Sequence, residues 1–207
     1  MAWKVVIAED FKMMRTVFEH TVEKSDEYEL AASFPTARQA VEYCSRNPVH
    51  LVLMDVLFPG SMSGLAASRL IKEENPKIRI IIMTSMPELT YERQAREIGI
   101  EGFWRKEVQE QSIFEVMNRV MRGEIVYPTE QLRIKLGNAD STEFTEREVE
   151  VLKALVSGAS NQEIAEALDM KEPTVKTHIA NLLQKTGFHS RLELAVRARH
   201  LGLVIED

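Results

Sequence analysis

The sequence has little that would suit an exported or membrane-spanning protein. Its one cysteine, Cys44, cannot form an internal disulfide and is most simply a small core residue. No run approaches the roughly 18 apolar residues that a membrane helix requires. After Met1 there is no basic region followed by an apolar stretch and a small-residue cleavage site. These absences argue against redox function and membrane insertion, and they favour a cytoplasmic protein.

The first half of the chain alternates strand-like and helix-like segments. Helical spacing of apolar residues is clear in Ala37 to Asn47, and Pro48 then ends that helix. Repeated βα units of this kind predict an α/β fold with a doubly wound, five-stranded parallel sheet in residues 1–122. The predicted strands are Lys4 to Ala8, Glu29 to Phe34, His50 to Met54, Arg79 to Met83 and Gly102 to Arg105.

Residues 123–142 interrupt this pattern, and we interpret them as a linker. Within them Glu130 to Leu136 could hold a short helix capped by Thr129. Residues 143–207 show no strand-like run before the last few positions, which predicts a small all-α second domain. Its helices are expected to start at the capping boxes Thr145 to Glu148 and Ser160 to Glu163, then at Pro173 and after Ser190.

Polar side chains stand at the ends of four predicted strands. Glu9 and Asp10 follow the first, Asp55 the third and Thr84 the fourth, and Lys106 follows the last. In an open parallel sheet these ends meet at one edge, which predicts one shared site. Three carboxylates offer hard oxygen ligands suited to Mg²⁺, and Mg²⁺ with Lys106 would balance their charge. Such a site can accept a phosphoryl group, and Asp55, alone on its strand, is the candidate acceptor.

With these residues, positions 3 to about 122 resemble the receiver domain of bacterial two-component response regulators, which has a flavodoxin-like fold. The resemblance implies that a histidine kinase phosphorylates Asp55. It also implies that Glu9, Asp10, Asp55 and the Leu57 backbone carbonyl hold Mg²⁺. Thr84 and Lys106 match the family's switch hydroxyl and phosphate-binding lysine, and Phe103 matches its switch ring.

Two features depart from the family pattern. The family commonly has a glycine eight residues after the phosphorylated aspartate, whereas Gly64 lies nine residues after Asp55. This spacing indicates a one-residue insertion in the loop beside the site. Glu107 stands where proline commonly follows the lysine, so we expect no cis peptide bond there.

The third helix of the second domain has two distinct faces. Val175, Ile179 and Leu182 share one face, and the opposite face is polar. The whole chain has a net charge of −6, but Lys171 to Arg199 contains 6 Lys and Arg against 2 Asp and Glu. This local positive charge favours nucleic acid as the partner. The spacing fits a helix-turn-helix, with Asn161 to Leu168 as first helix and Pro173 to Thr186 as recognition helix, although a plain helical bundle would fit it equally well.

The motifs Phe-Thr-Glu-Arg-Glu148, Ser-Asn-Gln-Glu-Ile-Ala165, Thr-Val-Lys-Thr-His178 and Ser-Arg-Leu-Glu193 closely resemble the LuxR-type DNA-binding domain. By that resemblance the recognition helix reads the major groove of double-stranded DNA. The residues assigned to DNA binding are Thr174, Lys176, Thr177, Ala180, Asn181 and Lys185, with Lys185, Thr174 and Arg191 open to phosphate contact or packing.

A receiver followed by a LuxR-type domain is the arrangement of the NarL/FixJ response regulators. We therefore expect a phosphorylation-controlled transcription factor, not an enzyme, that forms a homodimer when phosphorylated. One alternative is a DNA-binding regulator whose receiver responds to a partner without phosphorylation. Another is a Mg²⁺-dependent phosphohydrolase resembling the haloacid dehalogenase group. Against it, Ala8-Glu-Asp-Phe11 lacks that group's Asp-x-Asp motif, and no substrate cap is evident.

Overall fold

The computed structural model describes residues 2–60, 62–85, 89–106, 111–129 and 133–204. The chain divides into two compact units, one of residues 1–85 with 91–129 and one of residues 86–90 with 130–207. Within the described residues no helix is long and apolar enough to cross a membrane. Each unit is described below by itself.

The first unit is built on a five-stranded parallel sheet with the order β2-β1-β3-β4-β5. The strands are β1 (Trp3–Ala8), β2 (Tyr28–Phe34), β3 (Leu51–Asp55), β4 (Arg79–Thr84) and β5 (Gly102–Arg105). This order is that of flavodoxin-like doubly wound sheets, and it confirms the predicted fold class. The predicted strand limits agree with the observed ones to within a residue at each end.

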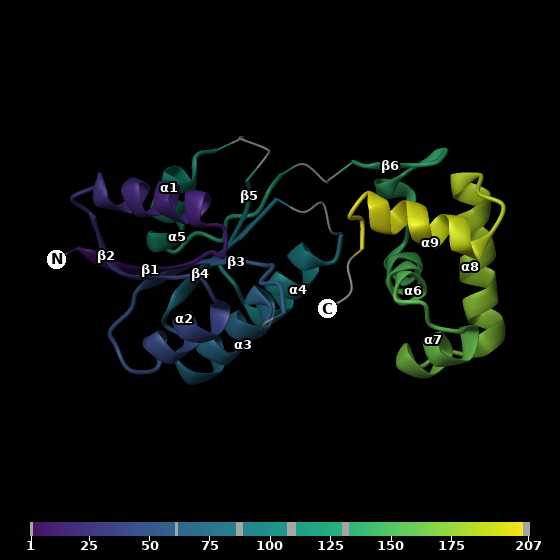
Figure 1. Ribbon diagram of the computed structural model, residues 1–207, viewed down its shortest axis with the longest axis horizontal. Helices are drawn as coiled ribbons and strands as arrows, with labels where there is room; N and C mark the ends of the chain where they lie inside the picture. The colour runs from purple at the N-terminus through teal and green to yellow at the C-terminus, as the bar shows by residue number, and fades with distance from the viewer. Residues whose placement is uncertain (1, 61, 86–88, 107–110, 130–132, 205–207) are drawn as a thin grey trace. The chain divides into compact units, whose positions relative to one another are not determined.

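Helices cover both faces of this sheet. In Figure 1, α1 and α5 lie on one face, and α2, α3 and α4 lie on the other. Their bounds are α1 (Lys12–Glu23), α2 (Ala37–Cys44), α3 (Gly64–Glu74), α4 (Tyr91–Ile98) and α5 (Ile113–Met121). Because both faces are covered, β3 is buried at every position and β4 at every position after Arg79. Cys44 is buried at the end of α2, as expected of a core residue.

The segment after α5 returns to the edge of the sheet. Gly123 has a φ of +95°, which turns the chain back. Val126 then pairs in parallel with Gly102 on β5. Its side chain is 4% exposed and packs in the core between the sheet and α1 with α5. Residues 123–129 of the predicted linker are thus part of the first unit.

The second unit is mainly helical. Its elements are β6 (Lys135–Leu136), β7 (Ala139–Asp140), the 3₁₀ turn Ser141–Glu143, α6 (Glu146–Val156), α7 (Asn161–Ala167), α8 (Glu172–Thr186) and α9 (Arg191–His200). The caps follow the sequence pattern, since Thr145 and Ser160 form capping boxes and Ser190 accepts a hydrogen bond from the Glu193 N–H. Apolar residues of all four helices and of the β6–β7 hairpin form one core.

The short helix predicted for Glu130 to Leu136 is wrong where it can be checked. Residues 130–132 lie outside the described residues, and Lys135–Leu136 form a strand that pairs with Ala139–Asp140. Gly137 at the hairpin turn has a φ of +62°, which favours glycine. The hairpin is held to the second unit because the Asn138 N–H donates to the Thr186 carbonyl (2.9 Å) at the end of α8. Tertiary contact with α8 therefore outweighs local helix propensity.

Candidate functional site

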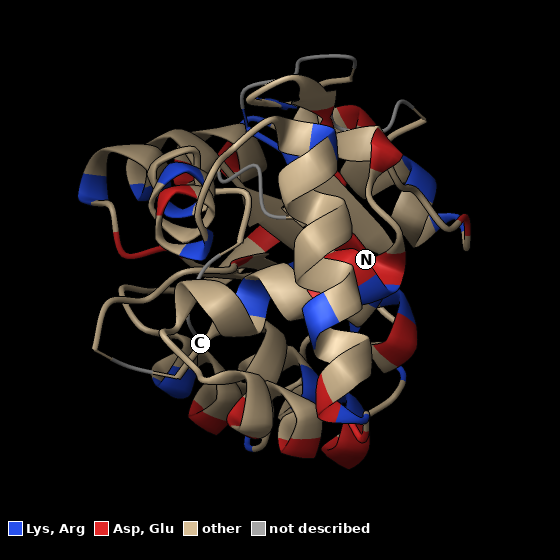
Figure 2. Ribbon diagram, turned by 90° about the vertical axis from the view of Figure 1, so that its right-hand side faces the viewer, with Lys and Arg blue, Asp and Glu red and all other residues tan. Residues whose placement is uncertain are grey.

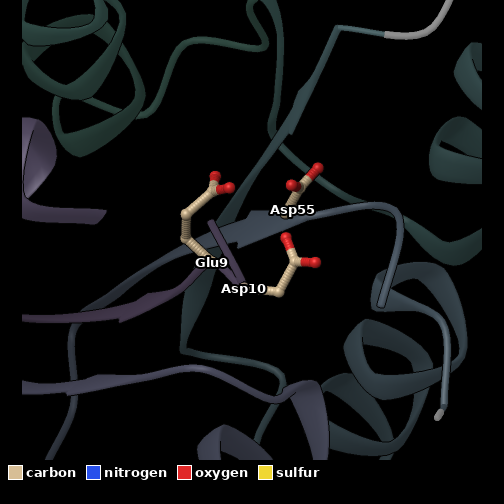
Figure 3. Close-up of side chains that lie close together, drawn as sticks. All are labelled: Glu9, Asp10 and Asp55. Carbon is tan, nitrogen blue, oxygen red and sulfur yellow. The ribbon is translucent and has the colours of Figure 1, made fainter. Parts of the chain in front are cut away.

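Three carboxylates meet at the carboxyl edge of the sheet (Figure 3). Glu9 and Asp10 follow β1, and Asp55 is the last residue of the adjacent β3. One oxygen from each carboxylate lies within 4.8 Å of the others. Glu9 is 1% exposed and Asp55 8% exposed, whereas Asp10 is open to solvent. The parallel topology thus brings together the acidic residues that the sequence assigned to one site.

Lys106, which follows β5, links two of these carboxylates. Its ammonium nitrogen lies 2.7 Å from Glu9 Oε2 and 2.8 Å from Asp55 Oδ2, and its side chain is 7% exposed. The other Asp55 oxygen, Oδ1, accepts the Val56 backbone N–H at 2.7 Å. Asp55 is therefore oriented from both sides by donors.

The electrostatics of this group favour additional positive charge. Burial and the neighbouring charge of Asp55 raise the pKa of Glu9 to about 7. Burial would lower the pKa of Lys106, but the charges and hydrogen bonds of Asp55 and Glu9 outweigh it and raise that pKa. Lys106 is thus firmly cationic. One lysine facing three carboxylates leaves the cluster acidic, and its oxygen ligands are those that a hard divalent cation such as Mg²⁺ prefers.

The remaining predicted residues of this site lie around the cluster. Thr84 ends β4 and is 2% exposed, and its carbonyl accepts the Lys106 backbone N–H at 2.8 Å. Leu57 lies half-buried in the loop after β3. Phe103 is 3% exposed in β5. A backbone hydrogen bond therefore joins Thr84 and Lys106, two of the predicted switch residues, directly.

Gly64 fixes the loop in which the sequence indicates an insertion. A Cβ built on Gly64 would lie 1.7 Å from the Asp55 carbonyl oxygen, so no other residue fits without a shift of backbone. The Gly64 N–H donates to the Val56 carbonyl at 2.8 Å. The start of α3 thus packs directly against the backbone of the candidate acceptor, and the glycine nine residues along serves this contact.

Arg15 is a residue that the sequence reasoning missed. Its Nη1 donates to the Glu9 carbonyl at 2.8 Å from within α1. Arg15 therefore fixes the backbone that carries the first two carboxylates. The spacing of six residues from Glu9 gives no signal of this contact, because α1 begins between them.

The exposed face of α8 carries most of the residues assigned to DNA. Thr174, Lys176, Thr177, Ala180 and Asn181 are exposed. Val175, Ile179 and Leu182 on the other face are buried in the core. Figure 2 faces α8 and shows blue segments spaced along a mostly uncharged helix. The two faces predicted from the sequence are therefore present.

Lys185 is engaged within the domain. Its ammonium nitrogen lies 2.7 Å from the Glu143 carbonyl and 2.7 Å from Glu148 Oε2. Glu148 is 2% exposed and also completes the capping box of α6. Arg191 similarly donates to Asn161 Oδ1 (2.9 Å) and the Ala159 carbonyl (2.7 Å). Lys185 and Arg191 could each contact phosphate or stabilise the domain. These hydrogen bonds correspond to the second role.

Comparison with known proteins matches both units. Residues 5–118 match the family model of the response regulator receiver domain, and residues 142–198 match that of bacterial regulatory proteins of the luxR family. The chain belongs to the LuxR-type response regulators. These response regulators are phosphorylation-controlled transcriptional regulators that bind DNA.

Curated proteins match the chain over nearly their whole length. The chain is 30% identical to Fimbriae Z protein of Escherichia coli over an alignment of 206 positions, which covers 97% of this chain and 98% of that protein. It is 30% identical to response regulator protein VraR of Staphylococcus aureus over an alignment of 210 positions, which covers 99% of this chain and 100% of that protein. The solved structure of RcsB from Salmonella enterica serovar Typhimurium, bound to a promoter, matches with a TM-score of 0.66 and 19% identity over 95% of this chain and 98% of that chain. At that identity the match supports the fold of this response regulator.

Proposed function

We propose that Asp55 is the residue at which this response regulator is phosphorylated. The observation that carries the proposal is the cluster in which Lys106 contacts both Glu9 and Asp55 while Asp10 lies alongside. A carboxylate held by donors on both oxygens is positioned for in-line attack on phosphorus. One Asp55 oxygen forms the new P–O bond as the P–N bond of a phosphohistidine donor on a histidine kinase breaks. The imidazole of the donor leaves with the bond's electron pair.

The same cluster fits Mg²⁺. Glu9, Asp10, Asp55 and the Leu57 carbonyl would hold the ion, since they provide oxygen ligands and excess negative charge. Bound there, the ion would neutralise the phosphoryl oxygens and the crowded carboxylates. Asp10 is the exposed member, so it lies on the side from which an ion and a donor can enter.

Phosphorylation changes what Lys106 and Thr84 can bind. The acyl phosphate replaces one negative charge of Asp55 by about two and adds oxygen acceptors. Lys106 already contacts Asp55 Oδ2 and would pair with the new oxygens. The Thr84 hydroxyl would turn toward the phosphoryl group, and Phe103 would follow on the adjacent strand. A shift from 1:99 to 99:1 between two states requires about 5.5 kcal/mol of differential interaction.

The output is DNA binding by α8. Lys176, Thr177 and Asn181 would face base edges in the major groove, with Ala180 between them and Thr174 near a phosphate. For Lys185 we favour a role in holding α8 to α6 over direct phosphate contact. Phosphorylation would promote a homodimer in the cytoplasm, with two α8 helices reading half-sites about one helical turn apart.

The test combines mass spectrometry with gel-shift of genomic fragments, using acetyl phosphate and Mg²⁺ as donor and ion. The wild-type protein should gain one phosphoryl group and bind its fragments more tightly. Asp55→Asn should gain none and should show equal DNA affinity with and without donor. Phosphorylation of Asp55→Asn to the wild-type extent would reject Asp55 as acceptor. A donor-independent affinity in a fully phosphorylated wild type would instead support regulation by a protein partner.

A further inference from the structure

Tyr127, just beyond α5, packs on the ring that is expected to respond to phosphorylation. The centroids of the Phe103 and Tyr127 rings are 5.9 Å apart, and their planes are inclined by 21°, a stacked arrangement. Phe103 is 3% exposed, so in this position its ring is covered. Both residues belong to the first unit.

The backbone around Tyr127 is tied to the same strand. The Phe103 N–H donates to the Val126 carbonyl at 2.8 Å, and the Val126 N–H donates to the Glu101 carbonyl at 2.8 Å. Val126 therefore acts as a short added strand at the outer edge of β5. A movement of Phe103 would act on residues 126 and 127 through both the backbone and the ring.

Two further contacts fix the Tyr127 ring. Its hydroxyl donates to the Ile100 carbonyl at 3.0 Å. The guanidinium carbon of Arg96, on α4, lies 3.7 Å from the ring centroid, a cation–π distance. Burial raises the pKa of the Tyr127 hydroxyl, so it stays a protonated donor in the physiological range. Tyr127 thus connects β5, α4 and the chain that continues toward residue 142.

We propose that Tyr127 couples the position of the Phe103 ring to the segment joining the two units. The inference rests on the proposed function, because it assigns Phe103 to the response at Asp55. When Phe103 moves, the Tyr127 ring loses the ring on which it stacks. The hydrogen bonds between β5 and Val126 change with it. The following residues, Pro128 and Thr129, carry that change along the covalent connection to the DNA-binding domain. Tyr127 is a positioning residue and takes no part in phosphoryl transfer.

The test measures DNA affinity with and without acetyl phosphate and Mg²⁺, and the ratio of the two affinities is the coupling. Tyr127→Ala should accept the phosphoryl group at Asp55 to the wild-type extent by mass spectrometry. Its coupling should fall about five- to tenfold, toward a ratio of one. Tyr127→Phe retains the ring but loses the hydroxyl donor, so it should keep most of the coupling.

Tyr43 on α2 provides a matched control. Its ring lies 5.5 Å from that of Phe34, and its hydroxyl donates to the Ala31 carbonyl at 3.2 Å. Tyr43→Ala therefore removes a similar ring pair and hydrogen bond near β2, at the other edge of the sheet. It should keep the wild-type coupling. If Tyr127→Ala keeps it too, or loses no more than Tyr43→Ala, the proposal is overturned.

Hydrogen exchange separates this inference from the proposed function. Phosphodonor should change the protection of the Val126 amide in the wild type and leave it unchanged in Asp55→Asn. A change at Val126 without any change in DNA affinity would uphold the Phe103 to Tyr127 link and contradict the proposed output. Tight, donor-dependent DNA binding with an unaltered Val126 amide would uphold the proposed function and overturn the inference.

Discussion

Lys106 at the acidic edge of the sheet and Lys176 on α8 are both lysines with carboxylate partners, yet their surroundings differ. The Lys106 side chain is 7% exposed and contacts two carboxylates at the ends of other strands. The Lys176 side chain is 62% exposed and pairs at 2.8 Å with Glu172, one turn away on the same helix. A buried charge that loses its partners is costly, whereas an exposed pair contributes little to stability. The receiver therefore holds the Lys106 ammonium in a fixed position before any ligand binds, whereas Lys176 on α8 can leave Glu172 at little cost.

The largest expected effect comes from Gly64→Ala, which tests the rigid packing beside Asp55 in the receiver. The added Cβ would collide with the Asp55 carbonyl oxygen, so the start of α3 or the end of β3 must shift. We expect a loss of about 4 kcal/mol or more in the free energy of unfolding, measured by urea denaturation.

Gly60→Ala is the control for this change. Gly60 has a φ of +67°, but among the residues that the structure describes no atom beyond its chain neighbours lies within 4 Å of the position that an added Cβ would take. Its substitution should cost about 1 kcal/mol from backbone strain. Equal losses in the two variants would show that the close approach at Gly64 does not constrain the site.

Lys106→Met tests the buried lysine directly. It leaves Glu9 and Asp55 without their cation, and we expect it to lower the free energy of unfolding by about 3 kcal/mol at pH 7 without divalent ions. At pH 5 the loss should shrink, because Glu9, whose pKa is already raised to about 7, then carries a proton and repels Asp55 less. Urea denaturation at both pH values checks this, and a loss independent of pH would contradict the electrostatic origin.

Glu148→Gln tests a carboxylate in the second unit that is buried like Glu9 and Asp55 in the receiver. Although burial opposes it, hydrogen bonding from Lys185 and Thr145 lowers the pKa of Glu148 below its ordinary value of 4.5. Its contribution is therefore fully present above about pH 4.5 and is lost as the pH falls through the lower, folded-state value. The variant should be less stable by about 1–2 kcal/mol at pH 7.

Denaturation of the full chain from pH 7 to pH 3 provides the readout for Glu148. The wild type should lose more stability over this range than Glu148→Gln, which has no carboxyl to protonate. Glu146→Gln, in the same first turn of α6 but exposed, is the matched control and should follow the wild-type profile. Parallel profiles for the wild type and Glu148→Gln would contradict the assignment.

Lys176→Met should have the smallest effect on stability, within about 0.5 kcal/mol, because its ion pair is exposed. Its effect should appear in DNA binding instead. If Lys176 contacts a phosphate, affinity falls on every fragment and the slope of log affinity against log salt decreases by about one. If it contacts a base, affinity falls on the cognate fragment more than on others. An unchanged affinity on all fragments would remove Lys176 from the interface.

The sequence was a good guide to features that depend on local pattern. Apolar runs predicted all five strands of the sheet, and hydroxyl-to-glutamate spacing placed the starts of α6 and α7. The acidic cluster could also be predicted from the sequence, because the carboxyl ends of parallel strands lie at one edge of the sheet. What could be predicted from sequence was thus the set of groups that a repeated motif or a simple topology brings together.

Contacts that join segments distant in the sequence could not be predicted in this way. Lys185 meets Glu148 from 37 positions away, and nothing in the spacing distinguishes it from a lysine that reaches phosphate. The β6–β7 hairpin is held by the contact of Asn138 with the end of α8, although a short helix was predicted for Glu130 to Leu136. The Tyr127 contact with Phe103 likewise depends on Val126 joining β5. Each of these requires the tertiary packing to be known first.

The hydrogen bond from the Gly64 N–H to the Val56 carbonyl joins the two ends of the loop that connects β3 to α3. In such a loop, one additional residue changes the entropy of closure by only about 0.1 kcal/mol. The loop can therefore gain or lose a residue in evolution with almost no change in the free energy of folding that arises from loop closure. Because the loop starts beside Asp55, the proposed acceptor, its length would provide an independent means of adjusting how easily a phosphodonor, or a hydrolysing water, reaches that carboxylate.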